Sequence, residues 1–205
     1  MTDRVIRVLV AEDQSMVRGA LRALLDLEED ITVVAEVGRG DEVLAAAREH
    51  RPDVALLDIE MPGRDGLEAA RELAAQLPGV RAVVLTTFGR PGFLRRAMEV
   101  GAAGFLVKDA PVAELARSIR AVVAGERVID RELAAAALAI GATPLSAREA
   151  DVLREAADGA TVADIARRLF LSEGTVRNYL SSAIGKTGAR TRVEAARVAA
   201  DKGWL

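Results

Sequence analysis

Short apolar segments alternate with longer segments of helical spacing over the first 125 residues, and this alternation constrains the fold more than any other feature. Five apolar, β-branched runs predict β-strands, at residues 5–10, 31–34, 54–57, 80–85 and 104–107. Strands that are apolar along their whole length and separated by helices are typical of a parallel sheet covered on both faces. Since such strands are joined by right-handed crossovers, the first 125 residues predict a doubly wound α/β domain.

Five strands in a segment of this length fit a flavodoxin-like fold, in which the strand order is 2-1-3-4-5. The alternation stops after Gly125, and residues 130–140 predict a short helix that is followed by the turn signal Gly141–Pro144. We therefore predict a domain over 1–125, a linker with a short helix over 126–142, and a second domain over 143–205.

Only helical patterns follow Leu145. Ser146 and Glu149 form the sequence pattern of a capping box, so they predict the start of a first helix that ends at Gly159. Three more helices are expected, over about 161–169, 172–186 and 191–200. The second domain is thus predicted to be a small all-α domain of four helices.

The residue inventory excludes several classes of site. The chain has no cysteine, which excludes disulfides and thiolate chemistry. It has a single histidine, His50, which argues against a metal site built from several histidines. We interpret His50 as a solvated residue at a helix end. No signal peptide is visible and no apolar run reaches the roughly 18 residues that span a bilayer, so we expect a cytoplasmic protein.

Charge is distributed unevenly along the chain. The whole chain has a net charge of −3, whereas residues 143–205 contain ten Lys and Arg against eight Asp and Glu. Residues 173–205 contain six basic and three acidic residues. This modest excess of positive charge permits DNA binding at the C-terminal end without establishing it.

Polar side chains stand where the predicted strands end. Glu12-Asp13 follows the first strand, Asp58 the third and Lys108 the fifth, and the fourth strand ends in Thr86-Thr87. Because strands 1 and 3 are neighbours in the predicted order, three carboxylates should share one edge of the sheet. Such a cluster repels itself unless a cation lies within it, and the all-oxygen ligand set points to Mg²⁺ or Mn²⁺.

Asp58 is the candidate nucleophile at this edge, because the buried run before it holds its backbone in place. Thr86 could donate a hydrogen bond to a transferred phosphoryl group, and Lys108 could pair with its charge. Taken singly, each of these residues could merely cap a helix. A phosphatase of the haloacid-dehalogenase kind is a further alternative, but its chemistry needs a second Asp two residues after the nucleophile, where this chain has Glu60.

The segments 161–169 and 172–186 have the layout of a helix-turn-helix, with the second helix as the candidate DNA reader. Val176, Leu180 and Ala183 are expected to face the core. The positions expected to face outward are Thr175, Arg177, Asn178, Ser181, Ser182 and Lys186.

On this outward face, Arg177 and Asn178 suit base edges, while Lys186, Arg190 and Arg192 suit phosphates. A plain surface helix in a bundle is the alternative. Gly185-Lys186-Thr187 is not the end of a phosphate-binding loop, because that motif needs a glycine where the chain has Leu180.

The motifs Glu12-Asp13, Asp58–Gly63, Thr86 and Gly104–Lys108 together resemble the receiver domain of bacterial response regulators, over roughly residues 4–125. The resemblance implies that Glu12 and Asp13 position Mg²⁺, with Asp13, Asp58 and the backbone carbonyl of Glu60 as its protein ligands. It also implies that Asp58 accepts a phosphoryl group from a histidine kinase and that Thr86 and Phe105 act as the switch. As an alternative, Phe105 is simply a core residue.

Residues 143–205 resemble the LuxR-type DNA-binding domain of the NarL/FixJ response regulators. The resemblance is carried by 145–149, Ile165-Ala166, 171–177, Lys186 and 192–195, and the pattern departs at Gly185 and Thr187. It implies a transcriptional regulator that dimerises when phosphorylated, with the last helix as the dimer contact on DNA. It also implies a protein that is not an enzyme beyond phosphorylating itself from a phosphodonor and dephosphorylating itself.

Shorter stretches at 86–93, 174–179 and 202–205 are similar to a regulator of this family that acts in a lipid-desaturase pathway. This finer resemblance implies a membrane-bound histidine kinase as partner and membrane-lipid genes as targets. A DNA binder that has a vestigial receiver and ignores phosphorylation remains an alternative, although the intact acidic set argues against it.

Overall fold

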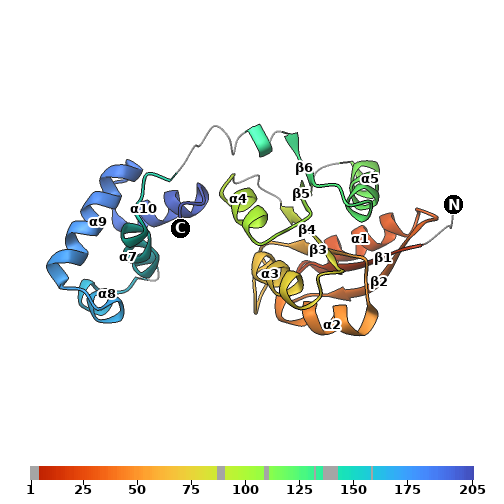
Figure 1. Ribbon diagram of the computed structural model, residues 1–205, viewed down its shortest axis with the longest axis horizontal. Helices are drawn as coiled ribbons and strands as arrows, with labels where there is room; N and C mark the ends of the chain where they lie inside the picture. Colours follow the sequence, from red (N-terminus) through yellow and green to blue (C-terminus); the bar gives the residue numbers. More distant parts are fainter. Residues whose placement is uncertain (1–4, 87–90, 109–110, 132, 136–142, 158) are drawn as a thin grey trace. The chain divides into compact units, whose positions relative to one another are not determined.

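The computed structural model describes residues 5–86, 91–108, 111–131, 133–135, 143–157 and 159–205. The chain forms two compact units: residues 1–89 and 96–134 make up the first, and residues 90–95 and 135–205 make up the second. Each unit has its own hydrophobic core. Figure 1 shows the helices and strands of both. Among the described residues, no helix is long and apolar enough to cross a membrane.

The first unit is an α/β unit built around one parallel sheet. Its strands are β1 (Ile6–Ala11), β2 (Ile31–Val37), β3 (Val54–Asp58), β4 (Arg81–Thr86), β5 (Gly104–Val107) and β6 (Val128–Ile129). Their order is β2-β1-β3-β4-β5-β6, and every pair of neighbours is parallel. The predicted order of the first five strands is confirmed.

The prediction of five strands was wrong by one, because β6 lies within the segment expected to be a linker. Its backbone pairs with β5, since Val128 N donates to Ala103 O at 3.1 Å and Asp130 N donates to Phe105 O at 3.1 Å. A strand of two residues has no periodicity to recognise, which is why the sequence did not reveal it. Of the helix predicted over 130–140, residues 131 and 133–135 are helical, and 136–140 lie outside the described residues, as do Gly141 and Ala142.

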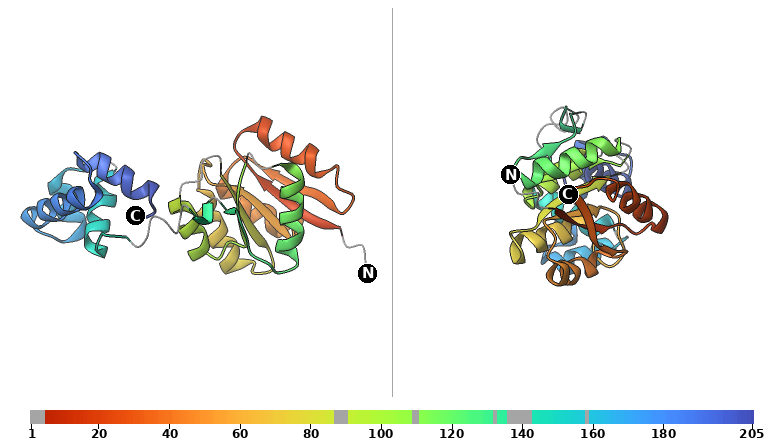
Figure 2. Two further views of the ribbon diagram at one scale, coloured as in Figure 1. Left: turned by 90° about the horizontal axis from the view of Figure 1, so that it is seen from above. Right: turned by 90° about the vertical axis from the view of Figure 1, so that its right-hand side faces the viewer.

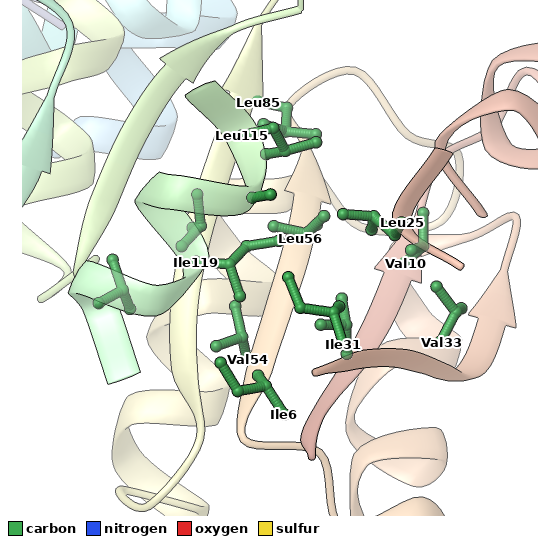
Figure 3. Packing of buried hydrophobic residues seen from close by; sticks show 14 of the residues in the cluster. Ile6, Val10, Leu25, Ile31, Val33, Val54, Leu56, Leu85, Leu115 and Ile119 are labelled. Carbon is green, nitrogen blue, oxygen red and sulfur yellow. The ribbon is translucent and has the colours of Figure 1, made fainter. Parts of the chain in front are cut away.

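Helices cover both faces of the sheet (Figure 2). They are α1 (Ser15–Leu25), the 3₁₀ turn η1 (Gly40–Glu42), α2 (Val43–His50), α3 (Gly66–Gln76), α4 (Pro91–Glu99) and α5 (Val112–Val123). Leu25 of α1 and Ile119 of α5 pack with Leu56 on one face (Figure 3). Val43 of α2 and Leu73 of α3 share the other cluster with strand residues such as Leu57. The sheet is therefore buried on both sides, as its apolar strands predict.

The second unit contains α7 (Ala147–Ala157), α8 (Val162–Leu169), α9 (Glu173–Thr187) and α10 (Arg192–Asp201). Its core is almost entirely aliphatic and includes Leu153, Ile165 and Leu180. All four helices begin with hydroxyl caps, in which the residue before the helix accepts a hydrogen bond from the backbone N–H three residues later; the caps are Ser146, Thr161, Ser172 and Thr191. The prediction of a small all-α domain of four helices is confirmed for residues 143–157 and 159–205.

Candidate functional site

Three carboxylates converge at the carboxyl edge of the sheet. Glu12 and Asp13 follow β1, and Asp58 ends β3, which is hydrogen-bonded to β1. One ligand oxygen from each of the three residues lies within 4.8 Å of the others. Glu12 and Asp58 are buried, whereas Asp13 is exposed, so the cluster opens to solvent on the Asp13 side.

Lys108 joins this cluster from the end of β5. Its Nζ lies 2.5 Å from Glu12 Oε2 and 2.9 Å from Asp58 Oδ1, and its side chain is only 10% exposed. The backbone N–H of Lys108 donates to Thr86 O at 2.8 Å, which connects the residue after β5 to the end of β4. The cation is thus held between the two buried carboxylates.

The electrostatics of the cluster follow from burial and from this cation. Burial raises the pKa of Asp58, and the hydrogen bond and charge of Lys108 only partly oppose the rise. Burial raises the pKa of Glu12 in the same way, with a further rise from the charge of Asp58. Burial would lower the pKa of Lys108, but its bonds to Glu12 and Asp58 outweigh that effect and raise it.

Three carboxylates against one ammonium leave the cluster with an excess of negative charge. The atoms of these carboxylates that could bind a metal are all oxygens, and those of Asp13 are exposed to solvent. Hard divalent cations such as Mg²⁺ prefer oxygen ligands and keep several waters. The residues therefore fit a divalent cation, with Glu12, Asp13 and Asp58 as the side chains that could hold it.

The loop after β3 depends on a glycine that the sequence analysis did not single out. Gly66 N donates to Ile59 O at 3.0 Å, and a Cβ atom on Gly66 would lie 2.0 Å from Asp58 O. Glycine is therefore the residue that lets the start of α3 approach the backbone of Asp58 so closely. Its position after Asp65, the N-cap of α3, is the signal that could have revealed it. Glu60 lies in this loop with its side chain exposed.

The two expected switch residues occupy neighbouring strands. Thr86 is buried at the end of β4, where its backbone is in register with Val107. Phe105, in β5, is fully buried, so its ring lies inside the unit in this structure. The sequence expected Thr87 to end the same strand, but that residue lies outside the described ones.

A second candidate site is the helix-turn-helix formed by α8 and α9. Val176, Leu180 and Ala183 are buried, as predicted, so α9 turns the opposite face outward. Five of the six side chains expected on that face are exposed, and Thr175 is half-buried, with its hydroxyl 2.8 Å from Ser172 Oγ. Those five are Arg177, Asn178, Ser181, Ser182 and Lys186.

The basic residues of this site differ in their partners. Arg177 pairs with Glu173 on its own helix at 2.6 Å, and both side chains are exposed. Arg190 is exposed, whereas the half-buried Arg192 donates to Ala160 O at 2.9 Å. Arg177 and Arg190 are therefore accessible to a ligand, while Arg192 is anchored within the unit.

Gly185 and Thr187, where the sequence departs from the family pattern, do not shorten the recognition helix. α9 continues through both residues and ends at Gly188, whose φ of 69° lies in the left-handed region that favours glycine. The Thr187 hydroxyl donates to the carbonyls of Ala183 and Ile184, at 2.8 and 3.0 Å.

Glu149 is a functional candidate that the sequence analysis treated only as part of a capping box. The box is present, since Ser146 N donates to Glu149 Oε2 at 2.6 Å and Glu149 N donates to Ser146 Oγ at 3.3 Å. The same carboxylate also accepts hydrogen bonds from Ser182 and Lys186 of α9. Burial alone would raise the pKa of Glu149, but these bonds outweigh it and lower the pKa to about 2.

Comparisons with known proteins agree with this arrangement. Residues 8–120 match the response regulator receiver domain, and residues 143–199 match the bacterial regulatory proteins of the luxR family. The transcriptional regulatory protein YvfU of Bacillus subtilis is 48% identical over 98% of this chain and 100% of its own length. The transcriptional regulatory protein DesR of the same organism is 44% identical over 98% of this chain and 99% of its own.

Among solved structures, the RcsB–DNA complex of a two-component response regulator has a similar fold. It matches with a TM-score of 0.71 over 97% of this chain and 99% of its own, at 24% sequence identity.

Proposed function

This chain belongs to the response regulators with a luxR-type DNA-binding domain, and from that premise we propose that phosphorylation of Asp58 controls its binding to promoter DNA. The chain is a transcriptional regulator of a two-component system, composed of a receiver and a DNA-binding domain. Relatives of the whole chain are named as transcriptional regulators, not as phosphatases. We propose a receiver domain over 1–125, a connecting segment over 126–142 whose residues Val128 and Ile129 add β6 to the receiver sheet, and a DNA-binding domain over 143–205.

The observation that carries the proposal is the convergence of Glu12 and Asp13 on Asp58, whose Oδ1 lies 2.9 Å from Lys108 Nζ. In the proposed reaction, an oxygen of Asp58 bonds to phosphorus as the P–N bond of the kinase phosphohistidine breaks. The released imidazole takes up a proton. Lys108, already beside Asp58, is placed to pair with the phosphoryl charge.

Mg²⁺ would be held by Glu12, Asp13, Asp58 and the Glu60 carbonyl. When bound, it would supply positive charge that offsets the negative charge of the phosphoryl group during its transfer. Self-phosphorylation from a small phosphodonor and self-dephosphorylation would need the same residues.

Phosphorylation would act by shifting a population of two states. The phosphoryl group carries roughly two negative charges in place of the single charge of the Asp58 carboxylate, and Lys108 and Thr86 compensate this charge better in the active state. Thr86 would move toward the phosphate, and the buried position of Phe105 would be favoured as the space beside it closes. The activated chains would then dimerise and gain avidity for a two-fold symmetric DNA site.

Five of the eight residues that the sequence predicts as DNA contacts are the contacts that we propose. Thr175, Arg177, Asn178 and Ser181 lie on the N-terminal and central turns of α9, where base edges are read, and Arg190 follows the helix. The other three expected residues, Ser182, Lys186 and Arg192, each have a partner within the unit and would contact DNA only after losing it.

A sensor histidine kinase is the proposed partner of the receiver domain. The finer sequence resemblance supports a membrane-bound kinase and membrane-lipid target genes. A regulator of chromosomal genes works in the cytoplasm, and we propose that location for this chain.

The experiment compares the wild type, Asp58→Ala and Asp26→Ala, with and without a small phosphodonor and Mg²⁺. Binding is measured to a duplex selected from a random pool by the phosphodonor-treated protein. Asp26 is an exposed aspartate of the same unit and serves as the matched control. The wild type and Asp26→Ala should bind more tightly with the phosphodonor, and Asp58→Ala should not respond. Asp58→Ala that still responds would exclude Asp58 as the phosphorylated residue.

A further inference from the structure

The buried carboxylate of Glu149 connects the first helix of the second unit to the recognition helix. It lies in the first turn of α7 and is 5% exposed. Ser182 Oγ donates to its Oε1 at 2.6 Å, and Lys186 Nζ lies 2.7 Å from its Oε2. Together with the bond from Ser146 N, one carboxylate accepts two hydrogen bonds from α9 and one from the cap of its own helix.

Ser182 and Lys186 are one turn apart on α9, so they form one edge of that helix toward α7. The Lys186 side chain is 39% exposed, whereas the Glu149 side chain is 6% exposed. The ammonium therefore lies at the surface end of a buried pair. Its charge is largely compensated inside the domain.

Removing Lys186 from this pair would leave a buried carboxylate without its cation. Leaving one charged partner buried and unpaired carries a desolvation penalty that a new contact with a DNA phosphate must first overcome. Arg177 has no such obstacle, because its pair with Glu173 is exposed, at 62% and 51% for the two side chains. Water compensates that pair when it opens, so Arg177 can exchange Glu173 for DNA at little cost.

We propose that Glu149 is a positioning residue of the DNA interface, which fixes α9 against α7 and withholds Lys186 and Ser182 from DNA. The inference rests on the proposed DNA-binding role of α9. Contacts with phosphates add affinity for every sequence alike, so a cation that is withheld from DNA lowers non-specific binding. Glu149 thereby increases the preference of the domain for its own site.

The first test measures how binding to a short duplex of random sequence depends on salt. Each phosphate contact contributes about 0.9 to the slope of the logarithm of the binding constant against that of the salt concentration. Lys186→Met should leave the slope of the full chain unchanged, whereas Arg190→Met, at an exposed position, should lower it. A fall of about 0.9 in Lys186→Met would overturn the proposal.

The second test releases Lys186. Glu149→Gln keeps the capping box, because a glutamine side chain can also accept the hydrogen bond from Ser146 N, but it removes the charge that holds Lys186. Its slope should be steeper by about 0.9, and the double variant Glu149→Gln/Lys186→Met should return to the wild-type value. Preference for an in vitro selected duplex over the random one should fall in Glu149→Gln and recover in the double variant.

Glu194→Gln is the matched control, because Glu194 holds the start of α10 in the same way, with Arg190 N donating to it at 2.9 Å, and has the same charge. A Glu149→Gln slope equal to that of Glu194→Gln would overturn the proposal. Fluorescence of Trp204 checks that each variant folds, and if Glu149→Gln does not, the Lys186→Met result decides alone. Failure of the wild type to bind either duplex would instead refute the proposed function.

Discussion

The ammonium of Lys108 lies 2.9 Å from Asp58 Oδ1, although 50 residues separate the two along the chain. The same ammonium lies 2.5 Å from Glu12, so a single cation offsets two buried carboxylates. The proposed phosphorylation site is thus a set of charges that balance only partly, and a phosphoryl group would enter beside a cation that is already in place.

Lys108→Ala should weaken the coupling between phosphorylation and DNA binding. Without the cation, the phosphoryl charge is compensated less well in the active state, so the gain in DNA affinity on phosphorylation should fall by about tenfold. Without Lys108 the pKa values of Asp58 and Glu12 should rise further, because burial would be less opposed, and the onset of self-phosphorylation should therefore move to higher pH. DNA titrations and a pH series of phosphodonor labelling measure the two effects; an unchanged gain in affinity would contradict the proposed role of Lys108.

Asp13→Asn should weaken the binding of Mg²⁺ without damaging the fold. Asp13 is the exposed carboxylate of the cluster, so its replacement changes no core packing. Losing a direct charged ligand should cost at least the roughly 10- to 100-fold that loss of an outer-shell partner costs. Calorimetric titration with Mg²⁺ measures the change, with Asp26→Asn as the control. Equal affinity in Asp13→Asn and the wild type would exclude Asp13 as a ligand.

Gly66→Ala should disturb Asp58 through the backbone. The added Cβ would meet Asp58 O at 2.0 Å, so the loop or the strand end must move, at a cost of about 1–3 kcal/mol in stability. Phosphodonor labelling of Asp58 should slow as well. Gly79→Ala is the matched control, because a Cβ there meets nothing within 4 Å. Urea unfolding and labelling rates compare the two, and a Gly66→Ala protein as stable and as reactive as the control would refute this account.

Phe170→Asn should stabilise the second unit. Phe170 follows α8 in the left-handed region, with φ 55°, and the residue is 95% exposed, so little burial offsets the backbone strain. Asparagine tolerates this conformation better, which should raise the free energy of unfolding by about 0.5–1 kcal/mol. Phe170→Ala removes the same ring but keeps the strain and should not stabilise. Thermal unfolding followed by Trp204 fluorescence distinguishes the two variants; equal effects would refute the strain argument.

Acid should destabilise the second unit through Glu149. The bonds from Lys186, Ser182 and Ser146 lower its folded-state pKa to about 2, from 4.5 in the unfolded chain. A lowered pKa stabilises the fold above pH 4.5, and that contribution is lost as the pH falls from about 4.5 to about 2. The loss amounts to roughly 3 kcal/mol.

Urea unfolding followed by Trp204 fluorescence over this pH range should show the loss in the wild type. Glu149→Gln, which cannot titrate, should have a flatter profile, whereas Glu194→Gln should keep the wild-type profile. An identical acid dependence in Glu149→Gln and the wild type would show that another group is responsible.

Much of the fold could be predicted from local patterns. The five longer strands, the order of their pairing and the four helices of the second unit follow from apolar periodicity and from caps such as Ser172. Strand β6 could not be predicted, because two residues carry no period and only the edge of β5 gives them a partner. The inward face of α9, with Val176 and Leu180 buried, was predicted because helical spacing determines which side chains share a face.

The candidate site divides in the same way. The order of residues along the chain by itself determined which side chains stand at the strand ends, since parallel strands bring Glu12, Asp58 and Lys108 to one edge wherever the loops run. Only the tertiary structure decided which atoms meet: Lys108 with two carboxylates, Gly66 with the backbone of Asp58, and Glu149 with Lys186. Periodicity specifies the direction of a side chain relative to its own segment. Charge pairing and close approach depend on distances between segments far apart in the chain, which are set by how the packed elements meet.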